Sequence, residues 1–309
     1  MLTAIVFLLS LVTIFYSALN MLTAPEFKVQ QGIVLISGAS TGIGRHAAEH
    51  LADIGYTVFA GVRKQSDFES MEALNITRLH PLKFDVTDHT SCEAAIAHIR
   101  HESNNLNLPF AALVNNAGVA RREAAEFHSL SDARTVFDTN FFGMVDLTQM
   151  ALPILRASKG RVVMISSIAG IFGTPSAAIY ASSKFAMEGF SDSLRRSVRH
   201  HGVAVSIVEP AYVKSALATK AGLEKNPPLE MAALYPSIYS DKAEAKRQKG
   251  IANGDEPTVT TDAITHAITS PKPLTRYPVA NFNGLPGKLI SYMVAFVPDY
   301  AVDYLFTVV

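Results

Sequence analysis

The sequence predicts an α/β fold in which a single domain is built on a mainly parallel sheet of seven strands, with helices on both faces. Short apolar runs of strand type alternate with segments of helical spacing, which is typical of a parallel sheet covered on both sides. A chain of 309 residues, 49% of them hydrophobic, can bury one large core, and no Pro- or Gly-rich linker divides it. The expected strands are residues 33–37, 57–61, 80–84, 111–115, 161–166, 204–208 and 276–280.

A glycine-rich turn follows the first expected strand and opens a helix over residues 43–54. Glycines let the backbone come close to a ligand, and the exposed amides of a helix N-terminus attract phosphate. The spacing is not the G-x-G-x-x-G fingerprint of dinucleotide-binding proteins, so the turn taken alone also fits an ordinary glycine turn. The candidate cofactor-binding residues of this turn are Gly38, Ser40, Thr41, Gly42, Ile43 and Gly44.

The end of the second expected strand bears on the choice of cofactor. An acidic side chain at this place would bind the ribose 2′-hydroxyl of NAD, whereas an arginine can accept the 2′-phosphate of NADP. The strand ends instead on Arg63 and Lys64, without an acid, and a guanidinium matches a phosphate in geometry and charge. NADP(H) is therefore favoured over NAD(H). The alternative is that both cations are simply solvated, and Thr41 lacks the basic character that many NADP-linked glycine turns have.

A possible proton-transfer group lies in the segment Tyr180-Ala181-Ser182-Ser183-Lys184, with Ser167 upstream. The apolar spacing after Tyr180 predicts a helix, which places Tyr180 and Lys184 one turn apart on one face. A phenol has an unperturbed pKa of about 10, and a fixed ammonium beside it is expected to lower that pKa. Tyr180 could then exchange a proton with a substrate oxygen that Ser167 holds by a hydrogen bond. The same spacing also occurs on many helices by chance.

Together these residues resemble the short-chain dehydrogenase/reductase family. The run Pro273-Leu274-Thr275-Arg276-Tyr277-Pro278-Val279 also resembles its membrane-associated steroid and retinol dehydrogenase branch. The family's marks are a G-x-x-x-G-x-G turn, an N-N-A-G segment, a catalytic Asn, and a Ser followed by Y-x-x-x-K. In this chain they are Gly38, Gly42 and Gly44; Asn115-Asn116-Ala117-Gly118; Asn140; Ser167; and Tyr180 with Lys184. The resemblance covers about residues 32–280 and implies a Rossmann-type, doubly wound sheet.

The resemblance also implies roles for individual residues. Asn140, Ser167, Tyr180 and Lys184 would be catalytic, with Asn140 supporting a proton-relay water and Lys184 also binding the nicotinamide ribose. Further cofactor contacts are implied for Asp85 and Val86 at the adenine, for Asn116, Ala117 and Gly118, and for Pro210, Val213 and Ser215. The last three lie in Pro210-Ala211-Tyr212-Val213-Lys214-Ser215, which departs from the family's P-G-x-x-x-T, so the geometry of this loop is the part in doubt.

The chain ends suggest a membrane protein. Residues 2–19 contain no charged side chain, and the apolar stretch continues to residue 24, which is enough to cross a bilayer. We therefore expect an anchor at 1–24, a linker at 25–31, the catalytic domain at 32–285 with a substrate lid at 216–260, and an apolar extension at 286–309. A cleaved signal peptide is the alternative for the anchor, although a cationic n-region is missing. Pro286 and Pro298 argue against a second span.

The expected location is the endoplasmic reticulum membrane with the catalytic domain in the cytosol. The lone Cys92 excludes an intrachain disulfide, which fits a reducing compartment. The apolar lid, the anchor and the apolar C-terminal residues favour a lipophilic substrate, such as a steroid, a retinoid or another long-chain alcohol or ketone. The 27 basic and 27 acidic residues balance, so no basic surplus points to nucleic acid. A homodimer is a family expectation, with an interface on helices near 135–155 and 180–200.

Two other classes of function remain open at this stage. His46-Ala47-Ala48-Glu49-His50 matches the H-x-x-E-H pattern of zinc hydrolases, but it lies on the first helix after the glycine turn and has no evident third ligand. We therefore expect no metal. The other class is a membrane-tethered protein that binds a nucleotide without turnover.

Overall fold

The computed structural model describes residues 24–215, 217, 228–282 and 284–307. Within them, seven strands form one sheet in which every pairing is parallel, and the strand order is β3-β2-β1-β4-β5-β6-β7. Each expected strand is present, and none of its ends is shifted by more than two residues. The strands are β1 (Ile33–Ile36), β2 (Thr57–Val62), β3 (Leu79–Lys83), β4 (Phe110–Asn115), β5 (Arg161–Ile165), β6 (Ala204–Pro210) and β7 (Arg276–Val279).

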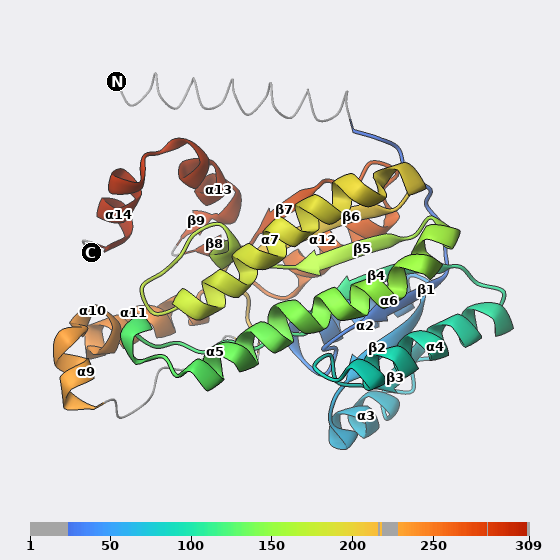
Figure 1. Ribbon diagram of the computed structural model, residues 1–309, viewed down its shortest axis with the longest axis horizontal. Helices are drawn as coiled ribbons and strands as arrows, with labels where there is room; N and C mark the ends of the chain where they lie inside the picture. The colour runs from blue at the N-terminus through green and yellow to red at the C-terminus, as the bar shows by residue number, and fades with distance from the viewer. Residues whose placement is uncertain (1–23, 216, 218–227, 283, 308–309) are drawn as a thin grey trace.

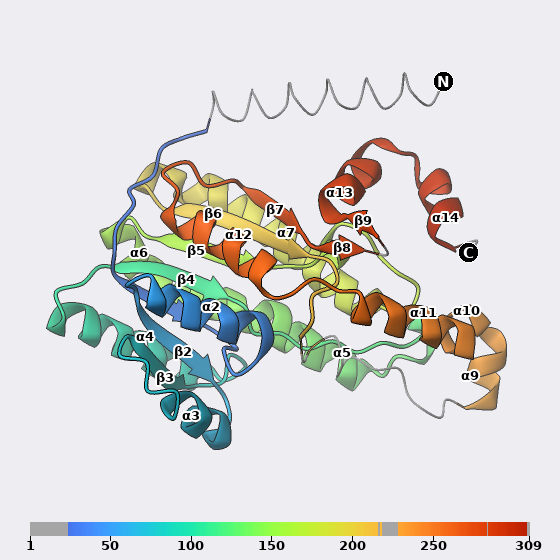
Figure 2. The ribbon, with the colours of Figure 1, turned by 180° about the vertical axis from the view of Figure 1, so that it is seen from behind.

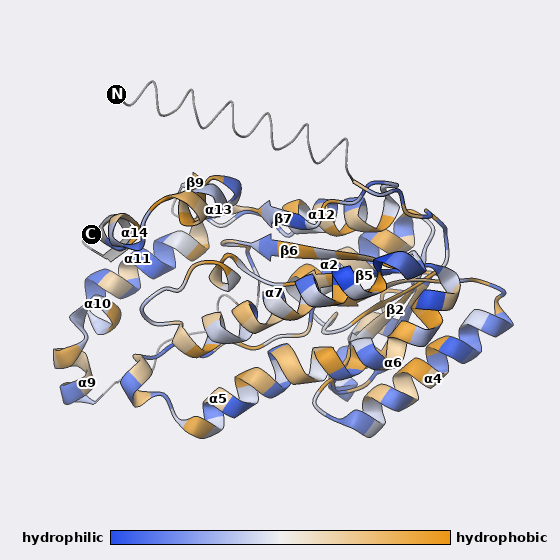
Figure 3. Cartoon of the chain, turned by 45° about the horizontal axis from the view of Figure 1, so that its top comes forward, coloured by the Kyte–Doolittle hydropathy of each residue, from blue (hydrophilic) through white to orange (hydrophobic). Residues whose placement is uncertain are grey.

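Helices cover both faces of this sheet, and each face has its own apolar core (Figures 1 and 2). On one face α2 (Gly42–Asp53) and α12 (Thr258–Thr269) pack on the strands through residues such as Leu51 and Ile264, both fully buried. On the other face α4 (His89–Asn105), α6 (Gly143–Ser158) and α7 (Ala178–Val198) pack through residues such as Ile99, Leu147 and Met187. Hydrophilic and hydrophobic residues alternate along these helices, as expected where one face is buried (Figure 3). The doubly wound architecture expected from the sequence is confirmed.

Shorter elements connect the strands at the edges of the sheet. They are α3 (Gln65–Glu72), the 3-10 turns η1 (Ala125–Phe127), η3 (Ile168–Gly170) and η4 (Arg199–His201), α5 (Leu130–Phe137) and the π-helical turn η2 (Asp138–Phe142).

The segment that precedes β1 is tied to the domain by hydrogen bonds. The Phe27 amide donates to the Pro271 carbonyl at 2.8 Å, and the Gln30 side chain donates to the Ser158 carbonyl at 2.7 Å. The buried guanidinium of Arg161 donates to the Lys28 carbonyl at 3.1 Å and to two carbonyls at the end of α12. Residues 25–31, which were expected to be a linker, therefore lie against the α/β domain.

The chain after β6 forms the helices α9 (Leu229–Leu234), α10 (Pro236–Tyr239) and α11 (Asp241–Ala252), which lie at the end of the molecule toward which the strand arrows point (Figure 1). After β7 follow a two-stranded hairpin, β8 (Asn281–Phe282) and β9 (Leu285–Pro286), and the helices α13 (Gly287–Phe296) and α14 (Asp299–Thr307). Ile290 of α13 is fully buried and packs with Phe282 and Ile168. This part of the C-terminal extension thus covers the loop that follows β5.

Several apolar side chains of the C-terminal extension are nevertheless exposed, including Phe296 at 64% and Tyr300 at 89%. In the described part of the chain no helix combines the length and the apolar character that a membrane span requires. The anchor expected at 1–24 lies almost entirely outside the described residues, and part of the lid expected at 216–260 does as well.

Candidate active site

The predicted site residues meet at one edge of the sheet, where the carboxyl ends of the parallel strands lie. This is the edge at which ligands bind in open α/β sheets. Each strand from β1 to β6 contributes residues just beyond its end. These are Gly38–Gly44 after β1, Arg63 after β2, Asp85 and Val86 after β3, Asn116–Gly118 after β4, Ser167 after β5, and Pro210, Val213 and Ser215 at the end of β6 and beyond it. Asn140 lies in η2, and Tyr180 and Lys184 lie in the first turns of α7.

The turn between β1 and α2 leaves no room for side chains at two of its glycines. A Cβ on Gly38, whose φ is +65°, would lie 2.6 Å from the Cα of Ala117. A Cβ on Gly44 would lie 2.6 Å from the carbonyl oxygen of Gly38. The turn can therefore be this tight only because both positions are glycine.

The N-terminus of α2 is suited to hold the phosphates of a dinucleotide. Thr41 is the N-cap residue, its side chain caps no backbone amide, and the first turn of α2 carries no acidic residue. The first amides of the helix thus keep their hydrogen-bonding capacity, and the helix dipole favours a negative charge there. The Asn116 side chain fixes the turn, because its amide donates to the carbonyls of Ser37 at 3.1 Å and Gly38 at 2.9 Å. These residues fit a nicotinamide dinucleotide.

Arg63 lies beside Asp85 at the far side of this turn. The guanidinium Nη1 is 3.8 Å from the Asp85 carboxylate, and 64% of the Arg63 side chain is exposed. Asp85 also accepts two hydrogen bonds from Thr87, at 2.9 Å from the amide and 2.8 Å from the hydroxyl. At 3.8 Å the ion pair is loose and exposed, so it holds the guanidinium only weakly. Arg63 can therefore turn toward a phosphate.

Tyr180, Ser167 and Lys184 come together as the sequence predicts. A side-chain hydrogen bond joins Tyr180 and Ser167, and the Lys184 ammonium lies 5.8 Å from the centre of the Tyr180 ring. Lys184 is 3% exposed and donates to the Ile165 carbonyl at 2.8 Å, so its position is well defined. Ser167 Oγ donates to the Pro210 carbonyl at 3.3 Å, which is long for a hydroxyl donor. Ser167 could exchange this weak bond for one to a substrate oxygen.

The pKa of Tyr180 departs from the sequence-based expectation. Burial raises this pKa above the ordinary value, while the hydrogen bond with Ser167 and the charge of Arg122 lower it in part. Lys184, which was expected to lower it, is not among the causes. Burial lowers the pKa of Lys184 itself to about 8, opposed by the charge of Glu188. The prediction was wrong on this point, because burial disfavours the charged form of both groups.

Asn140 is fully buried, and its side chain is engaged with the protein. The carbonyl oxygen accepts from the Val119 amide at 2.8 Å, and the side-chain nitrogen donates to the Val119 carbonyl at 2.9 Å and to Ser183 Oγ at 3.0 Å. Asn140 thereby joins η2 to the segment after β4 and to the helix that carries Tyr180. Its side chain positions these elements, and the implied contact with a relay water stays a prediction.

Two charged residues near the site were not found from the sequence. Glu188 lies one turn beyond Lys184 on α7 and is 7% exposed. Its spacing of four residues from Lys184 could have predicted that the two charges lie on one face of the helix. Arg122 follows the N-N-A-G segment, and its charge acts on Tyr180. No sequence spacing could have found Arg122, because only the fold brings it close to Tyr180.

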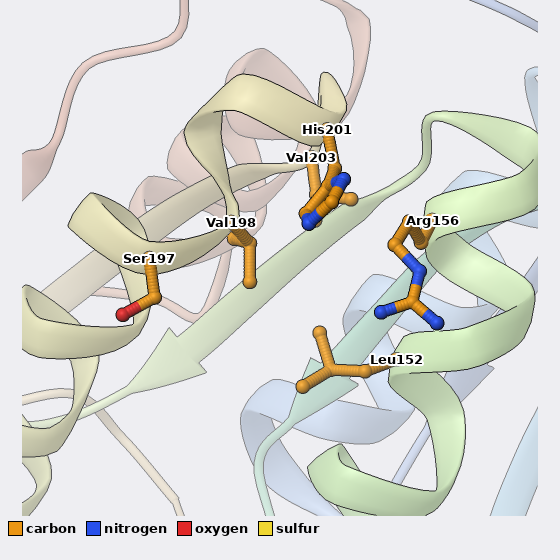
Figure 4. Close-up of a pocket in the computed structure, with 6 residues that line it drawn as sticks. All are labelled: Leu152, Arg156, Ser197, Val198, His201 and Val203. Carbon is orange, nitrogen blue, oxygen red and sulfur yellow. The ribbon is translucent and has the colours of Figure 1, made fainter.

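A small hollow of about 90 Å³ lies elsewhere, between α6 and the end of α7 (Figure 4). It is lined by Leu152, Arg156, Ser197, Val198, His201 and Val203. Ser197 is near the far end of α7, seventeen residues after Tyr180 and thus about 25 Å along the helix. The hollow is therefore separate from the site that Tyr180 and Lys184 form.

The described residues give no support to the zinc-hydrolase alternative. The His46 ring forms a hydrogen bond with Thr261 Oγ1 of α12 at 2.7 Å, which ties α2 to its neighbouring helix. Within the same part of the chain no group of three His, Cys, Asp or Glu side chains is placed to hold a metal ion.

Comparisons with known proteins agree with the geometry. The family model described as short chain dehydrogenase matches residues 32–226. The mitochondrial D-beta-hydroxybutyrate dehydrogenase of Mus musculus is 33% identical over 258 residues, which are 79% of this chain and 75% of the relative. The 17-beta-hydroxysteroid dehydrogenase type 6 of Bos taurus is 30% identical over 291 residues, 90% of this chain and 89% of the relative. The chain belongs to the short-chain dehydrogenase family.

Other relatives and solved structures differ in their cofactor. An NADPH-dependent 3-dehydrocapnine reductase of Ornithobacterium rhinotracheale is 32% identical over 88% of this chain and 95% of its own length. A short-chain dehydrogenase structure from Streptomyces avermitilis superposes with a TM-score of 0.72 at 26% identity, covering 89% of this chain and 96% of that one. Two Burkholderia structures with TM-scores of 0.68 and 0.67, at 20% and 21% identity, share the fold, one in complex with NADP and one with NAD. The protein is thus an oxidoreductase of a family that acts on hydroxyl or keto groups with a nicotinamide cofactor.

Proposed function

We propose that this protein transfers a hydride between NADP(H) and a lipophilic alcohol or ketone, with Tyr180 as the acid and base. The observation that carries this proposal is the proximity of Tyr180 to Ser167 and to Lys184, at the carboxyl ends of the strands. When bound, the nicotinamide supplies or accepts the hydride. The chain's own residues hold the substrate oxygen and move its proton.

The proton steps follow from the groups around Tyr180. In the direction of reduction, Ser167 donates a hydrogen bond to the carbonyl oxygen and Tyr180 gives its phenolic proton to the same oxygen. The raised pKa of Tyr180 keeps that proton in place at neutral pH. In the direction of oxidation Tyr180 must first lose its proton, so this activity should rise with pH.

The preference for NADP(H) rests on Arg63 and Lys64 at the end of β2. Arg63 is loosely paired and largely exposed, and a guanidinium binds a 2′-phosphate through charge-assisted hydrogen bonds. Asp85 is held by Thr87, so it does not satisfy the Arg63 charge tightly.

The lipophilic substrate and the membrane are also proposals. The lid helices α9, α10 and α11 carry apolar side chains, of which Leu229 is 90% exposed and Leu234 56%. The relatives described above include a hydroxysteroid dehydrogenase and a hydroxybutyrate dehydrogenase, so apolar and acidic substrates both occur among them.

We further propose an anchor at 1–24, an endoplasmic reticulum location with a cytosolic catalytic domain, and a homodimer through α6 and α7. Protease protection in sealed membranes and the mass of the detergent-solubilised protein test these proposals.

The decisive experiment replaces the acid and base. Tyr180→Phe removes the hydroxyl and keeps the ring, so turnover of lipophilic ketones with NADPH should fall on the order of 10²- to 10⁴-fold. Binding of NADPH, followed by its fluorescence, should stay close to wild type.

Tyr300→Phe is the matched control, because this tyrosine of α14 is 89% exposed and far from the catalytic groups in the sequence. Near-normal turnover by Tyr180→Phe would refute the role of Tyr180. Cofactor binding by the wild type without turnover of any alcohol or ketone in the panel would favour the nucleotide-binding alternative.

A further inference from the structure

Arg122 lies in the segment between β4 and η1, which contacts both the loop before α7 and the lid helix α10. Its Nη1 donates to Ser176 Oγ at 3.2 Å, and the next residue's amide donates to the Ser176 carbonyl at 3.0 Å. Ser176 stands one turn before Tyr180, in the loop that leads into α7. The Ala124 amide in turn donates to the Tyr239 hydroxyl of α10 at 2.9 Å. The segment of Arg122 is thus held between the start of the catalytic helix and the lid.

The charge of Arg122 is not neutralised by a contact among the described residues. Its only hydrogen bond there goes to a neutral hydroxyl, and no carboxylate of those residues lies within ion-pair distance. The side chain is partly exposed, so a ligand can reach it. Arg121, its neighbour in sequence, differs in exposure and in pairing. Its side chain is 59% exposed, and it forms an ion pair with Asp132 at 3.6 Å.

Glu244 of α11 is an acid on the lid on which the charge of Arg122 acts, and another arginine already pairs with it. Arg247 donates to the two Glu244 oxygens at 2.7 and 2.6 Å, and Gln248 donates to the same carboxylate at 2.6 Å. The charge of Arg122 also acts on Glu244, as it does on Tyr180. The charge of Arg122 thus acts on both Tyr180 and an acid that Arg247 already pairs.

Arg247 provides a second, independent sign of a missing anion. Its side chain is 10% exposed, and its Nη1 is buried without a hydrogen-bond partner in the described part of the chain. A buried guanidinium N–H without a partner is unfavourable, because it has lost its water and gained nothing in return. Arg247 pairs with the Glu244 carboxylate, while the charge of Arg122, which acts on the same carboxylate, has no carboxylate partner among the described residues.

We propose that Arg122, together with Arg247, binds an acid group of the substrate, so that the substrate is an apolar alcohol or ketone that also carries an oxyanion such as a carboxylate. This inference rests on the proposed function, since it names the substrate class of the same site. A guanidinium binds an oxyanion through two parallel N–H bonds, which fixes orientation as well as affinity. The acid group held at Arg122 would orient the hydroxyl or carbonyl of the substrate toward Tyr180.

Two substrates that differ only in charge test this inference. The wild type should oxidise 3-hydroxydodecanoate with a higher kcat/KM than methyl 3-hydroxydodecanoate, on the order of 10- to 100-fold, because loss of one charge-assisted interaction has this effect. Arg122→Leu should remove most of that preference by lowering kcat/KM much more for the acid than for the ester, and the ratio of the two values is the readout because the charge of Arg122 also acts on Tyr180. Arg122→Lys keeps the positive charge but loses the two parallel N–H donors of the guanidinium, so it should retain the preference for the acid only in part.

Arg121→Leu is the matched control and should keep the wild-type preference. A wild type that uses the ester as well as the acid, or an Arg122→Leu variant that keeps the preference, would overturn the inference.

A binding measurement separates this inference from the proposed function. With the cofactor present, dodecanoate should raise the melting temperature of the wild type more than dodecanol does, and Arg122→Leu should abolish the difference. If the wild type turns over neither hydroxy compound, the proposed redox function is refuted for this substrate class. The comparison of dodecanoate with dodecanol binding still tests the role of Arg122. Equal effects of dodecanoate and dodecanol would refute it.

Discussion

The two halves of the sheet bury different kinds of residues. In the described part of the chain, the buried charged residues are Arg161, Lys184, Glu188 and Glu209, and all of them follow residue 160. The half built on β1 to β4 buries apolar side chains and neutral polar groups such as Ser37 and Asn115. The half that starts at β5 therefore holds all the buried charges among these residues.

This difference corresponds to two ways of building a site. The first half forms its site from the backbone, because Gly38 and Gly44 allow a turn too tight for any Cβ and the amides of α2 stay uncapped. Such a site suits a cofactor that a whole family shares. The second half forms its site from charged side chains whose pKa values depend on burial, such as Lys184. The proton transfer that we propose for Tyr180 thus depends on that half.

The largest effect is expected from breaking the backbone site. In Gly44→Ala the new Cβ would lie 2.4 Å from Asn116 Nδ2 and 2.6 Å from the Gly38 carbonyl, so the turn must move. We expect the dissociation constant for NADPH to rise on the order of 10- to 100-fold and the stability to fall by about 1–3 kcal/mol. Titration calorimetry and urea unfolding measure the two effects.

Gly189→Ala on α7 is the control for this substitution. Nothing lies within 4 Å of a Cβ at this exposed helical position. It should leave cofactor binding unchanged and stabilise the protein by roughly 0.5–1 kcal/mol. Unchanged NADPH affinity in Gly44→Ala would mean that this turn does not hold the cofactor.

A smaller effect is expected where the first half does use a charged side chain. Arg63→Ala should lower the ratio of kcat/KM for NADPH to that for NADH by about 10-fold, because one charge-assisted contact to the 2′-phosphate is lost. Arg78→Ala, an exposed arginine just before β3 at the opposite edge of the sheet, should leave the ratio unchanged. A wild type that prefers NADH, or a ratio unaltered in Arg63→Ala, would contradict the proposed cofactor preference.

The smallest effect concerns the buried charges of the second half. Burial, and then the charge of Glu188, raise the pKa of Glu209 to about 8, although Arg276 lies 3.2 Å away. Since the folded-state pKa is raised above the unfolded value, this carboxyl favours folding at low pH and loses that contribution as pH rises through about 8. Glu209→Gln should therefore gain stability over the wild type at pH 9 and change little at pH 5.

The gain at pH 9 should be on the order of 1 kcal/mol, or about 2–4 °C in melting temperature for a domain of this size. Calorimetric scans at the two pH values measure it. Glu72→Gln, an exposed carboxyl at the end of α3, should show no such dependence on pH. A lower melting temperature of Glu209→Gln at pH 9 would show that the ionised carboxylate stabilises the fold.

Most of the fold could be predicted, and so could the first half's site. Buried parallel strands are continuous apolar runs, so strands such as 57–61 and 111–115 were placed within one residue at either end. The spacing of Gly38, Gly42 and Gly44 likewise predicted the tight turn between β1 and α2. The rest was less predictable: the pKa of Tyr180, the proposed roles of Arg122 and Arg247, and the packing of Ile290 against the loop after β5 all depend on contacts between distant segments.

The amino-acid sequence by itself determined the order of the strands' apolar runs, the glycine turn and the set of Ser167, Tyr180 and Lys184, because these features depend on local spacing. Only the tertiary structure decided which groups lose their water, and hence that Lys184 has a lowered pKa and Tyr180 a raised one. It also decided that the guanidinium of Arg122 lies beside the catalytic helix without an acidic partner among the described residues. Burial and charge balance arise from the whole fold, so no local pattern can report them.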